Sequence, residues 1–222
     1  MDIKSKISDI RSSLPDEVTL VAVSKFQSVE TIKTAYDAGQ RVFGESRVQE
    51  LTAKQPSLPE DIKWHFIGSL QTNKIKYIAP YISMIQSVDS LKLIKEIDRQ
   101  AKNYYRKIDI LIEVYIAEED SKHGFTPDEC KALFTDFALS NFTSIQVRGL
   151  MGMATFTNDV KQLKREFGVL KDLYDEIRLL PAIDRSIFTE LSMGMSGDYK
   201  TAVEQGSTMV RIGTAIFGER GY

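Results

Sequence analysis

The sequence is poor in the residues that form disulfide and metal sites. Its 222 residues include one cysteine, Cys130, and two histidines, His65 and His123. A single cysteine excludes an internal disulfide framework and is typical of a protein of the reducing cytoplasm. So few sulfur and imidazole groups offer no zinc-type ligand cluster, and no carboxylate spacing predicts an all-oxygen metal site. We therefore expect no metal centre.

The sequence also lacks an excess of charge of either sign and any long hydrophobic run. It has 29 Lys and Arg against 31 Asp and Glu, a formal net charge of −2, with the charges scattered along the chain. We therefore expect neither nucleic acid nor an anionic membrane as its main partner. No apolar run approaches the length of a membrane span. The first residues, 1-MDIKSKISDIRSSL-14, predict a short amphipathic helix and not a signal peptide, so we expect a cytoplasmic protein.

Strand-like and helix-like segments alternate along the chain. The clearest helix-like segment is 159–180, which has apolar residues at three- and four-residue spacing on one face. Ser28, Thr126-Pro127 and Asn158 are helix start signals. The strand-like runs cover residues 17–24, 41–46, 63–69, 82–90, 107–117, 144–155, 187–196 and 207–218.

This alternation predicts one α/β domain over residues 1–222, because no Pro-, Gly- or Ser-rich linker divides it. Strict β–α alternation implies a parallel sheet, and eight strands favour a single (β/α)8 TIM-type barrel with an extra N-terminal helix. A doubly wound open sheet is the alternative. No G-x-G-x-x-G follows the first strand, which weakens a dinucleotide-binding version of that alternative.

Polar and small residues lie where the predicted strands end, and this is the edge that carries the chemistry of such barrels. Lys25 follows the first strand. It is either a solvated residue or an amine held in an apolar scaffold, partly desolvated and able to attack a carbonyl. The segments 194-GMSGD-198 and 213-GT-214 follow the last two strands. They are either ordinary turns or a phosphate cradle, where small residues let backbone N–H groups approach an anion.

Arg211 and Gly213 are two residues apart on the last strand and therefore face the same way. A lysine, a phosphate cradle and an arginine together fit one cofactor, pyridoxal 5′-phosphate (PLP). That cofactor needs an amine for its aldehyde, an anion site for its phosphate and a partner for its pyridine nitrogen.

Nearly the whole chain resembles the pyridoxal phosphate homeostasis proteins, PLP-binding barrels similar to the N-terminal domain of alanine racemase. The matching segments are 21-VAVSK-25, 42-VFGESRVQEL-51, 64-WHFIGSLQTNK-74, 149-GLMGMA-154 and 190-ELSMGMSGDYKTAVEQGSTMVRIGTAIFG-218. The last block is long and highly specific. The resemblance implies a non-catalytic protein of intracellular PLP homeostasis that holds, buffers and delivers the cofactor.

The resemblance also implies roles for single residues. Lys25 is implied as the lysine that binds PLP as a Schiff base, with Arg211 near the pyridine nitrogen. Ser196, Gly213 and Thr214 are implied as phosphate contacts. Ser46 is a further candidate contact, although members of the family commonly have asparagine there. The Phe-Gln pair after Lys25 also departs from the family pattern, so the rim of the pocket is expected to differ.

The competing hypothesis is a PLP-dependent amino-acid racemase. A racemase needs bases on both faces of the substrate α-carbon, and Lys25 could serve one face. Related racemases take the second base, a tyrosine, from a C-terminal β-domain, whereas this chain ends directly after the eighth strand. We therefore expect a carrier without catalytic activity. We also expect it to be a monomer, with apo PLP-dependent enzymes as candidate recipients.

Three residues with reactive side chains are expected to lie outside the chemistry. His65 could be a catalytic base, but a histidine on a buried strand is more often a hydrogen-bonded core residue. Cys130 falls within a helix that begins at Pro127 and is expected to be structural. His123 is expected in a strand–helix loop.

Overall fold

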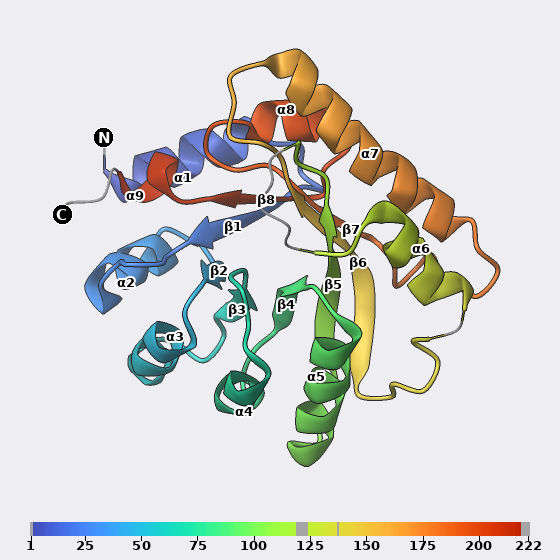
Figure 1. Cartoon of the computed structure of the whole chain (residues 1–222). Coiled ribbons are helices and arrows are strands. Elements are labelled where there is room, and N and C mark those ends of the chain that lie inside the picture. Colours follow the sequence, from blue (N-terminus) through green and yellow to red (C-terminus); the bar gives the residue numbers. More distant parts are fainter. Residues whose placement is uncertain (1, 119–123, 137, 219–222) are drawn as a thin grey trace.

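The computed structural model describes residues 2–118, 124–136 and 138–218, so His123 lies outside the described residues. Within them, eight parallel strands form a closed barrel in chain order (Figure 1). The strands are β1 (Thr19–Val23), β2 (Val42–Glu45), β3 (Lys63–Phe66), β4 (Met84–Val88), β5 (Ile108–Tyr115), β6 (Ile145–Met153), β7 (Glu190–Ser192) and β8 (Met209–Ile212).

The pairing of the first and last strands closes the barrel. β1 runs parallel to β8 over four residue pairs, from Thr19 opposite Met209 to Ala22 opposite Ile212. An open sheet would leave these two strands as edges. The (β/α)8 prediction is therefore confirmed, and the doubly wound alternative is wrong.

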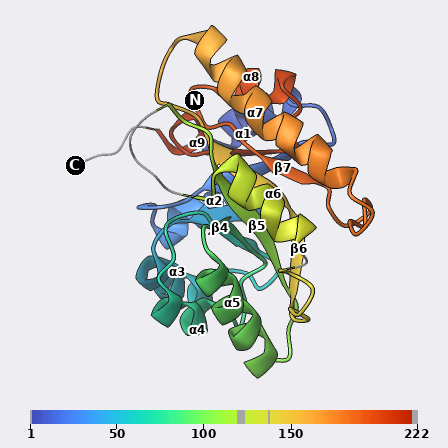
Figure 2. The same ribbon diagram turned by 45° about the vertical axis from the view of Figure 1, so that its right-hand side comes forward.

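Helices lie between the strands and surround the barrel. α1 and α9 lie side by side, and Figure 2 shows α6 and α7 packed together outside β5 and β6. The helices are α1 (Ile3–Ser12), α2 (Val29–Asp37), α3 (Val48–Lys54), α4 (Ile75–Ile78), α5 (Leu91–Asn103), α6 (Pro127–Thr135), α7 (Val160–Arg178), α8 (Tyr199–Glu204) and α9 (Thr214–Phe217), with 3-10 turns at Gln55–Ser57 and Thr72–Lys74. None of the helices in this described part has both the length and the apolar character to cross a bilayer.

Two of the three predicted helix start residues cap a helix in the structure. Ser28 caps α2 by accepting the Thr31 N–H, and Thr126 forms a capping box with Glu129 at the start of α6. The third prediction, that Asn158 caps the long helix α7, is wrong by one residue. Asp159 caps α7, accepting the N–H groups of Lys161 and Gln162, because its carboxylate reaches both.

The last two strands are shorter than the sequence predicted. β7 covers only Glu190–Ser192 within the expected 187–196. β8 ends at Ile212, and Thr214–Phe217, expected to continue the strand, forms helix α9. A short apolar run fits a strand or a helix equally well, which is why the pattern did not separate them.

The barrel interior has an apolar part and a polar part. Val21, Met84, Leu111, Met151 and Met209 pack together inside the strands. Gln86 and Arg211 come two residues after Met84 and Met209, so they face the same interior nearer the carboxyl ends of the strands. The larger apolar core lies between the strands and the helices and includes the predicted α7 face: Leu163, Phe167, Leu170, Leu173 and Ile177.

Candidate functional site

A pocket of about 420 Å³ opens at the carboxyl ends of the strands. All six residues predicted as site residues line it: Lys25, Ser46, Ser196, Arg211, Gly213 and Thr214. Its volume lies within the range of about 300–1,000 Å³ that is typical of small-molecule sites. The structure therefore brings together residues that are up to 189 positions apart in the chain (Lys25 to Thr214).

Lys25 is half-buried in a turn directly after β1. Ser24, before it, is fully buried, and its N–H donates to the Gly44 carbonyl of β2 at 3.0 Å. Phe26, after it, is 48% exposed. The chain thus leaves the barrel at Lys25, which places this amine at the boundary between the core and the pocket.

Ser196 connects the loops that follow β7 and β8. Its Oγ accepts the backbone N–H of Gly213 at 3.3 Å and that of Ala215 at 3.4 Å. Gly213 lies against the end of β1, since a Cβ there would be 3.3 Å from the Cβ of Val23. A side chain at 213 would require Val23 or this loop to shift by a few tenths of an ångström. Hydroxyl and N–H groups from two loops therefore gather close to the strand that precedes Lys25.

Arg211 is 4% exposed, and its guanidinium is held by named partners. Nη1 donates to Ser192 Oγ at 2.6 Å, and Nη2 donates to the Gly152 carbonyl at 3.0 Å. Burial lowers the pKa of Arg211 to about 10, and the charges of Glu113 and Asp198 act in the opposite direction. The side chain is still a cation at neutral pH, fixed at the wall of the pocket.

A buried polar chain continues from Arg211 into the barrel, and sequence reasoning missed most of it. Ser192 Oγ donates to Gln86 Oε1 at 2.7 Å, and Gln86 Nε2 lies 2.9 Å from His65 Nδ1. Burial lowers the pKa of His65 to about 3, so the ring is neutral. With Gln86 as donor, the ring proton is assigned to Nε2. His65 is thus a hydrogen-bonded core residue, as expected.

Glu166 of α7 anchors the loop after β6, a second group that the sequence did not reveal. Its carboxylate accepts the N–H and the hydroxyl of Thr155, each at 2.7 Å, and the Glu118 N–H at 3.2 Å. Burial alone would raise the pKa of Glu166, but these hydrogen bonds outweigh burial and lower it. Because Thr155 lines the pocket, Glu166 fixes one side of it.

Ser46 follows β2 and lines the pocket beside the loop after β3. Gly68 of that loop lies against the Ser46 backbone, since a Cβ on Gly68 would be 2.4 Å from the Ser46 carbonyl oxygen. The two loops can pack this closely only with glycine at position 68. The Ser46 backbone is therefore held against the loop after β3, at the edge of the pocket.

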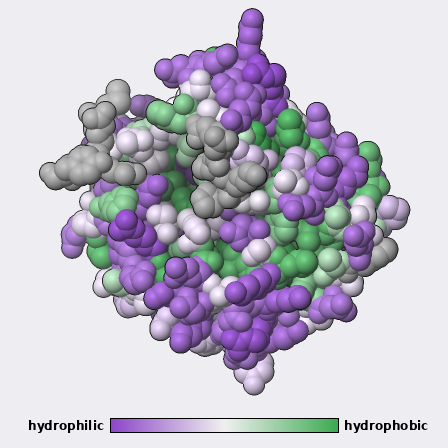
Figure 3. Space-filling model, viewed as in Figure 1, coloured by the Kyte–Doolittle hydropathy of each residue, from purple (hydrophilic) through white to green (hydrophobic). Residues whose placement is uncertain are grey.

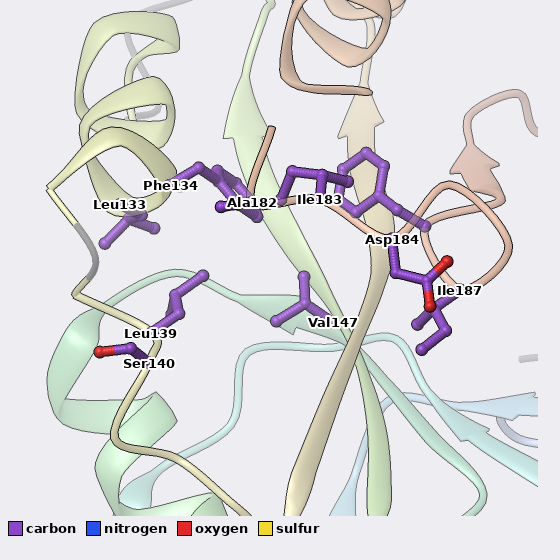
Figure 4. Close-up of a pocket in the computed structure, with 10 residues that line it drawn as sticks. Leu133, Phe134, Leu139, Ser140, Val147, Ala182, Ile183, Asp184 and Ile187 are labelled. Carbon is purple, nitrogen blue, oxygen red and sulfur yellow. The ribbon is translucent and has the colours of Figure 1, made fainter. Parts of the chain in front are cut away.

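A second cavity, of about 260 Å³, lies beside the beginning of β6 and the ends of α6 and α7 (Figure 4). It is lined mainly by apolar side chains such as Leu133, Val147 and Ile183. Asp184 is its one charged residue among the described lining, and its carboxylate already accepts the N–H and hydroxyl of Ser186. This cavity offers no amine or guanidinium within the described lining.

Cys130 gives no indication of another reactive centre in the part of the chain that the structure describes. Cys130 is fully buried in α6, and burial raises the pKa of its thiol to about 12, which fits the structural role expected. Among the residues that the structure describes, no cluster of His, Cys, Asp or Glu could hold a metal ion. Hydrophilic residues gather along the upper and lower edges of the face in Figure 3, and hydrophobic residues show between them.

The fold and the pocket define a (β/α)8 barrel of the class described as "Alanine racemase, N-terminal domain", whose family model matches residues 2–221. The chain is 39% identical over 210 residues to the "Pyridoxal phosphate homeostasis protein" of Pasteurella multocida, covering 92% of this chain and 88% of that protein. The human protein of the same name is 39% identical over 215 residues, covering 91% of this chain and 77% of that one. The chain belongs to the pyridoxal phosphate homeostasis protein family.

One solved structure agrees with this assignment, and a second shares the fold. The structure of PipY from Synechococcus elongatus, with PLP bound, superimposes with a TM-score of 0.87 at 36% identity, covering 98% of this chain and 100% of that one. An alanine racemase from Clostridium difficile gives a TM-score of 0.77 at 16% identity, covering all of this chain and 57% of the racemase. The second likeness concerns the fold alone.

Proposed function

We propose that the chain, as one barrel domain over residues 1–222, binds PLP in the pocket at the carboxyl ends of its strands and serves intracellular PLP homeostasis. One observation carries this proposal: an amine, a guanidinium and a set of hydroxyl and N–H donors line a single pocket of suitable volume. The PLP-bound structure of the relative PipY supports it.

The donor set fits three of the polar parts of PLP: the aldehyde, the phosphate and the pyridine nitrogen. Lys25 Nζ would be the amine that condenses with the aldehyde to a Schiff base, with release of water. Ser196, Thr214 and the backbone of Gly213 are the groups for the phosphate, because hydroxyl and N–H donors bind anions. Arg211 would be the partner of the pyridine nitrogen. Ser46 contributes at the edge of the pocket.

When PLP is bound, its ring supplies an electron sink for reactions of amines. Arg211 affects how strongly the ring can withdraw electrons. A guanidinium beside the pyridine nitrogen disfavours protonation of that nitrogen and so weakens the sink. The hydrogen bonds from Arg211 to Ser192 and Gly152 hold the guanidinium in place. Arg211 therefore narrows the amine chemistry that bound PLP could support, without excluding it.

The lining of the pocket also supports a carrier over a racemase. Among the described lining residues Lys25 is the one amine, and no tyrosine, histidine or cysteine accompanies it. Asp198 is the one carboxylate there, and it accepts the Met195 N–H at 2.5 Å. Inversion needs a second base on the opposite face of the substrate. We propose a cytoplasmic, monomeric protein without catalytic activity that delivers PLP to apo-enzymes.

Borohydride reduction followed by peptide mass mapping tests the central assignment. Purified protein with added PLP should absorb in the visible range, and reduction should fix a pyridoxyl group on Lys25. The Lys25→Ala variant should lose both signals, and Lys76→Ala, an exposed lysine of α4, should keep them. A pyridoxyl group mapped to another lysine, or none at all, would contradict the proposal.

A further inference from the structure

The turn that carries Lys25 contains a strained residue. The Gln27 N–H donates to the Ser24 carbonyl at 3.0 Å and closes a β-turn with Lys25 and Phe26 at its centre. Phe26 has a φ of 66°, in the left-handed region that a bulky side chain rarely adopts. Such a conformation persists only where the surrounding structure holds it, and it occurs preferentially at functional sites.

Two charged residues of α3 hold the peptide groups on both sides of Lys25. Lys54 is 8% exposed, and its Nζ donates to the Ser24 carbonyl at 2.9 Å. Glu50, one turn earlier in the helix, accepts the Phe26 N–H at 2.5 Å. Lys54 Nζ also donates to Glu50 at 2.5 Å, so the two contacts belong to one cluster.

Glu45 anchors this cluster to the barrel. Its fully buried carboxylate accepts from Lys54 Nζ at 2.9 Å and from Ser24 Oγ at 2.7 Å. The guanidinium of Arg47 lies 5.0 Å from the centre of the Phe26 ring and adds a cation–π contact on the outer side. The strained turn is therefore held from the end of β2, from α3 and from the loop between them.

We propose that Glu50 and Lys54 are positioning residues that hold the Ser24–Gln27 turn, so that Lys25 Nζ enters the pocket already oriented toward an aldehyde. Neither residue lines the pocket. They act through the backbone on either side of Lys25. The inference rests on the proposed function of the pocket and deepens it, because it names what makes this lysine competent to react.

Substitution of Glu50 tests the inference with little risk to the fold. Glu50→Ala removes the acceptor of the Phe26 N–H and leaves Lys54 paired with Glu45. We expect the borohydride-trappable bond between Lys25 and PLP to form about tenfold to a hundredfold more slowly, the range expected for loss of one charge-assisted hydrogen bond. Glu50→Gln keeps an oxygen for the Phe26 N–H and should recover most of the rate. Pyridoxamine 5′-phosphate, which cannot condense with a lysine, should bind Glu50→Ala and the unaltered protein equally well.

Asp98 provides a matched control at the other end of the barrel. Its buried carboxylate also accepts a backbone N–H from another element, Ser144 at 2.7 Å, and also pairs with a lysine four residues on, Lys102 at 2.7 Å. Asp98→Ala should leave the rate of trapping unchanged.

Three outcomes would overturn the inference. The first is Glu50→Ala reacting as fast as the unaltered protein. The second is an equal loss of pyridoxamine 5′-phosphate affinity, since that would indicate a general collapse of the pocket. The third is an equal slowing in Asp98→Ala. If the unaltered protein traps no PLP on Lys25, the proposed function itself fails, and this result is distinct from the other three.

Discussion

The guanidinium of Arg211 is hydrogen-bonded to the hydroxyl of Ser192 in the interior of the barrel, at 2.6 Å. Ser192 cannot donate back to a cation, so its proton goes to Gln86 Oε1, 2.7 Å away. The same amide contacts His65. The orientation of Arg211 at the pocket thus depends on residues that do not themselves line the pocket.

Ser192→Ala should therefore destabilise the protein. The substitution leaves a buried guanidinium N–H and the Gln86 carbonyl without their partner, which costs about 1–3 kcal/mol of the free energy of unfolding. Urea denaturation measures this change. Ser57→Ala, at an exposed position, should shift the same free energy by less than about 0.5 kcal/mol. Equal changes in the free energy of unfolding for the two substitutions would show that the hydrogen bonds of the Ser192 hydroxyl do not stabilise the folded protein.

Ser196→Ala and Thr214→Val should each weaken PLP binding and leave the fold intact. A hydrogen bond to a charged phosphate is worth about 1.5–3 kcal/mol, so each change should raise the Kd for PLP by about tenfold to a hundredfold. Fluorescence or absorbance titration measures it. Pyridoxal without the phosphate should bind both variants almost as well as the unaltered protein. A matching loss for pyridoxal would show that these hydroxyls do not contact phosphate.

The barrel could be predicted from the sequence because short strand and helix patterns alternate along the chain. The place of the pocket could be predicted because its residues follow the ends of the predicted strands. Alternation of strands and helices defines the barrel, and strand ends define the edge where Lys25 and Gly213 meet. The resemblance to a known family added Ser46 as a candidate contact and the role expected of each of the six residues toward PLP.

The contacts that support these residues could not be predicted, because they depend on three-dimensional register. Glu50 and Phe26 are 24 positions apart, and Ser192 and Gln86 are 106 apart, with nothing in either segment to indicate the partner. Helix α9 was missed for a different reason, since Thr214–Phe217 is too short and apolar for periodicity to decide.

His65 should make stability depend on pH in the acidic range. Its pKa is about 3 in the folded protein against 6.5 for an unperturbed histidine. Below pH 6.5 the unfolded chain therefore takes up a proton that the folded protein does not, so stability falls as the pH drops from 6.5 toward 3 and is unaffected by His65 above that range. The loss at pH 5 should be about 2 kcal/mol.

His65→Asn isolates this contribution, because asparagine keeps an acceptor for Gln86 and does not titrate. Denaturation curves between pH 4 and pH 8 should show a shallower acidic decline for the variant than for the unaltered protein. Parallel declines would mean that the histidine is protonated in the folded state and that burial does not control it.

The last prediction separates a carrier from a racemase. With Lys25 as the one amine among the described lining residues, and no tyrosine, histidine or cysteine beside it, the protein should invert alanine, serine and other common amino acids no faster than free PLP does. Deprotonation on one face without a positioned acid on the other gives α-proton exchange at best. Incubation of each L-amino acid in deuterated water tests this, with chiral chromatography for inversion and mass measurement for exchange. In parallel, the loaded protein should restore activity to an apo PLP-dependent enzyme in the same solution. Inversion well above the rate with free PLP, lost in Lys25→Ala, would favour the racemase. Exchange without inversion agrees with a carrier, because a bond between Lys25 and its cofactor that other amines can displace is what release to another protein requires.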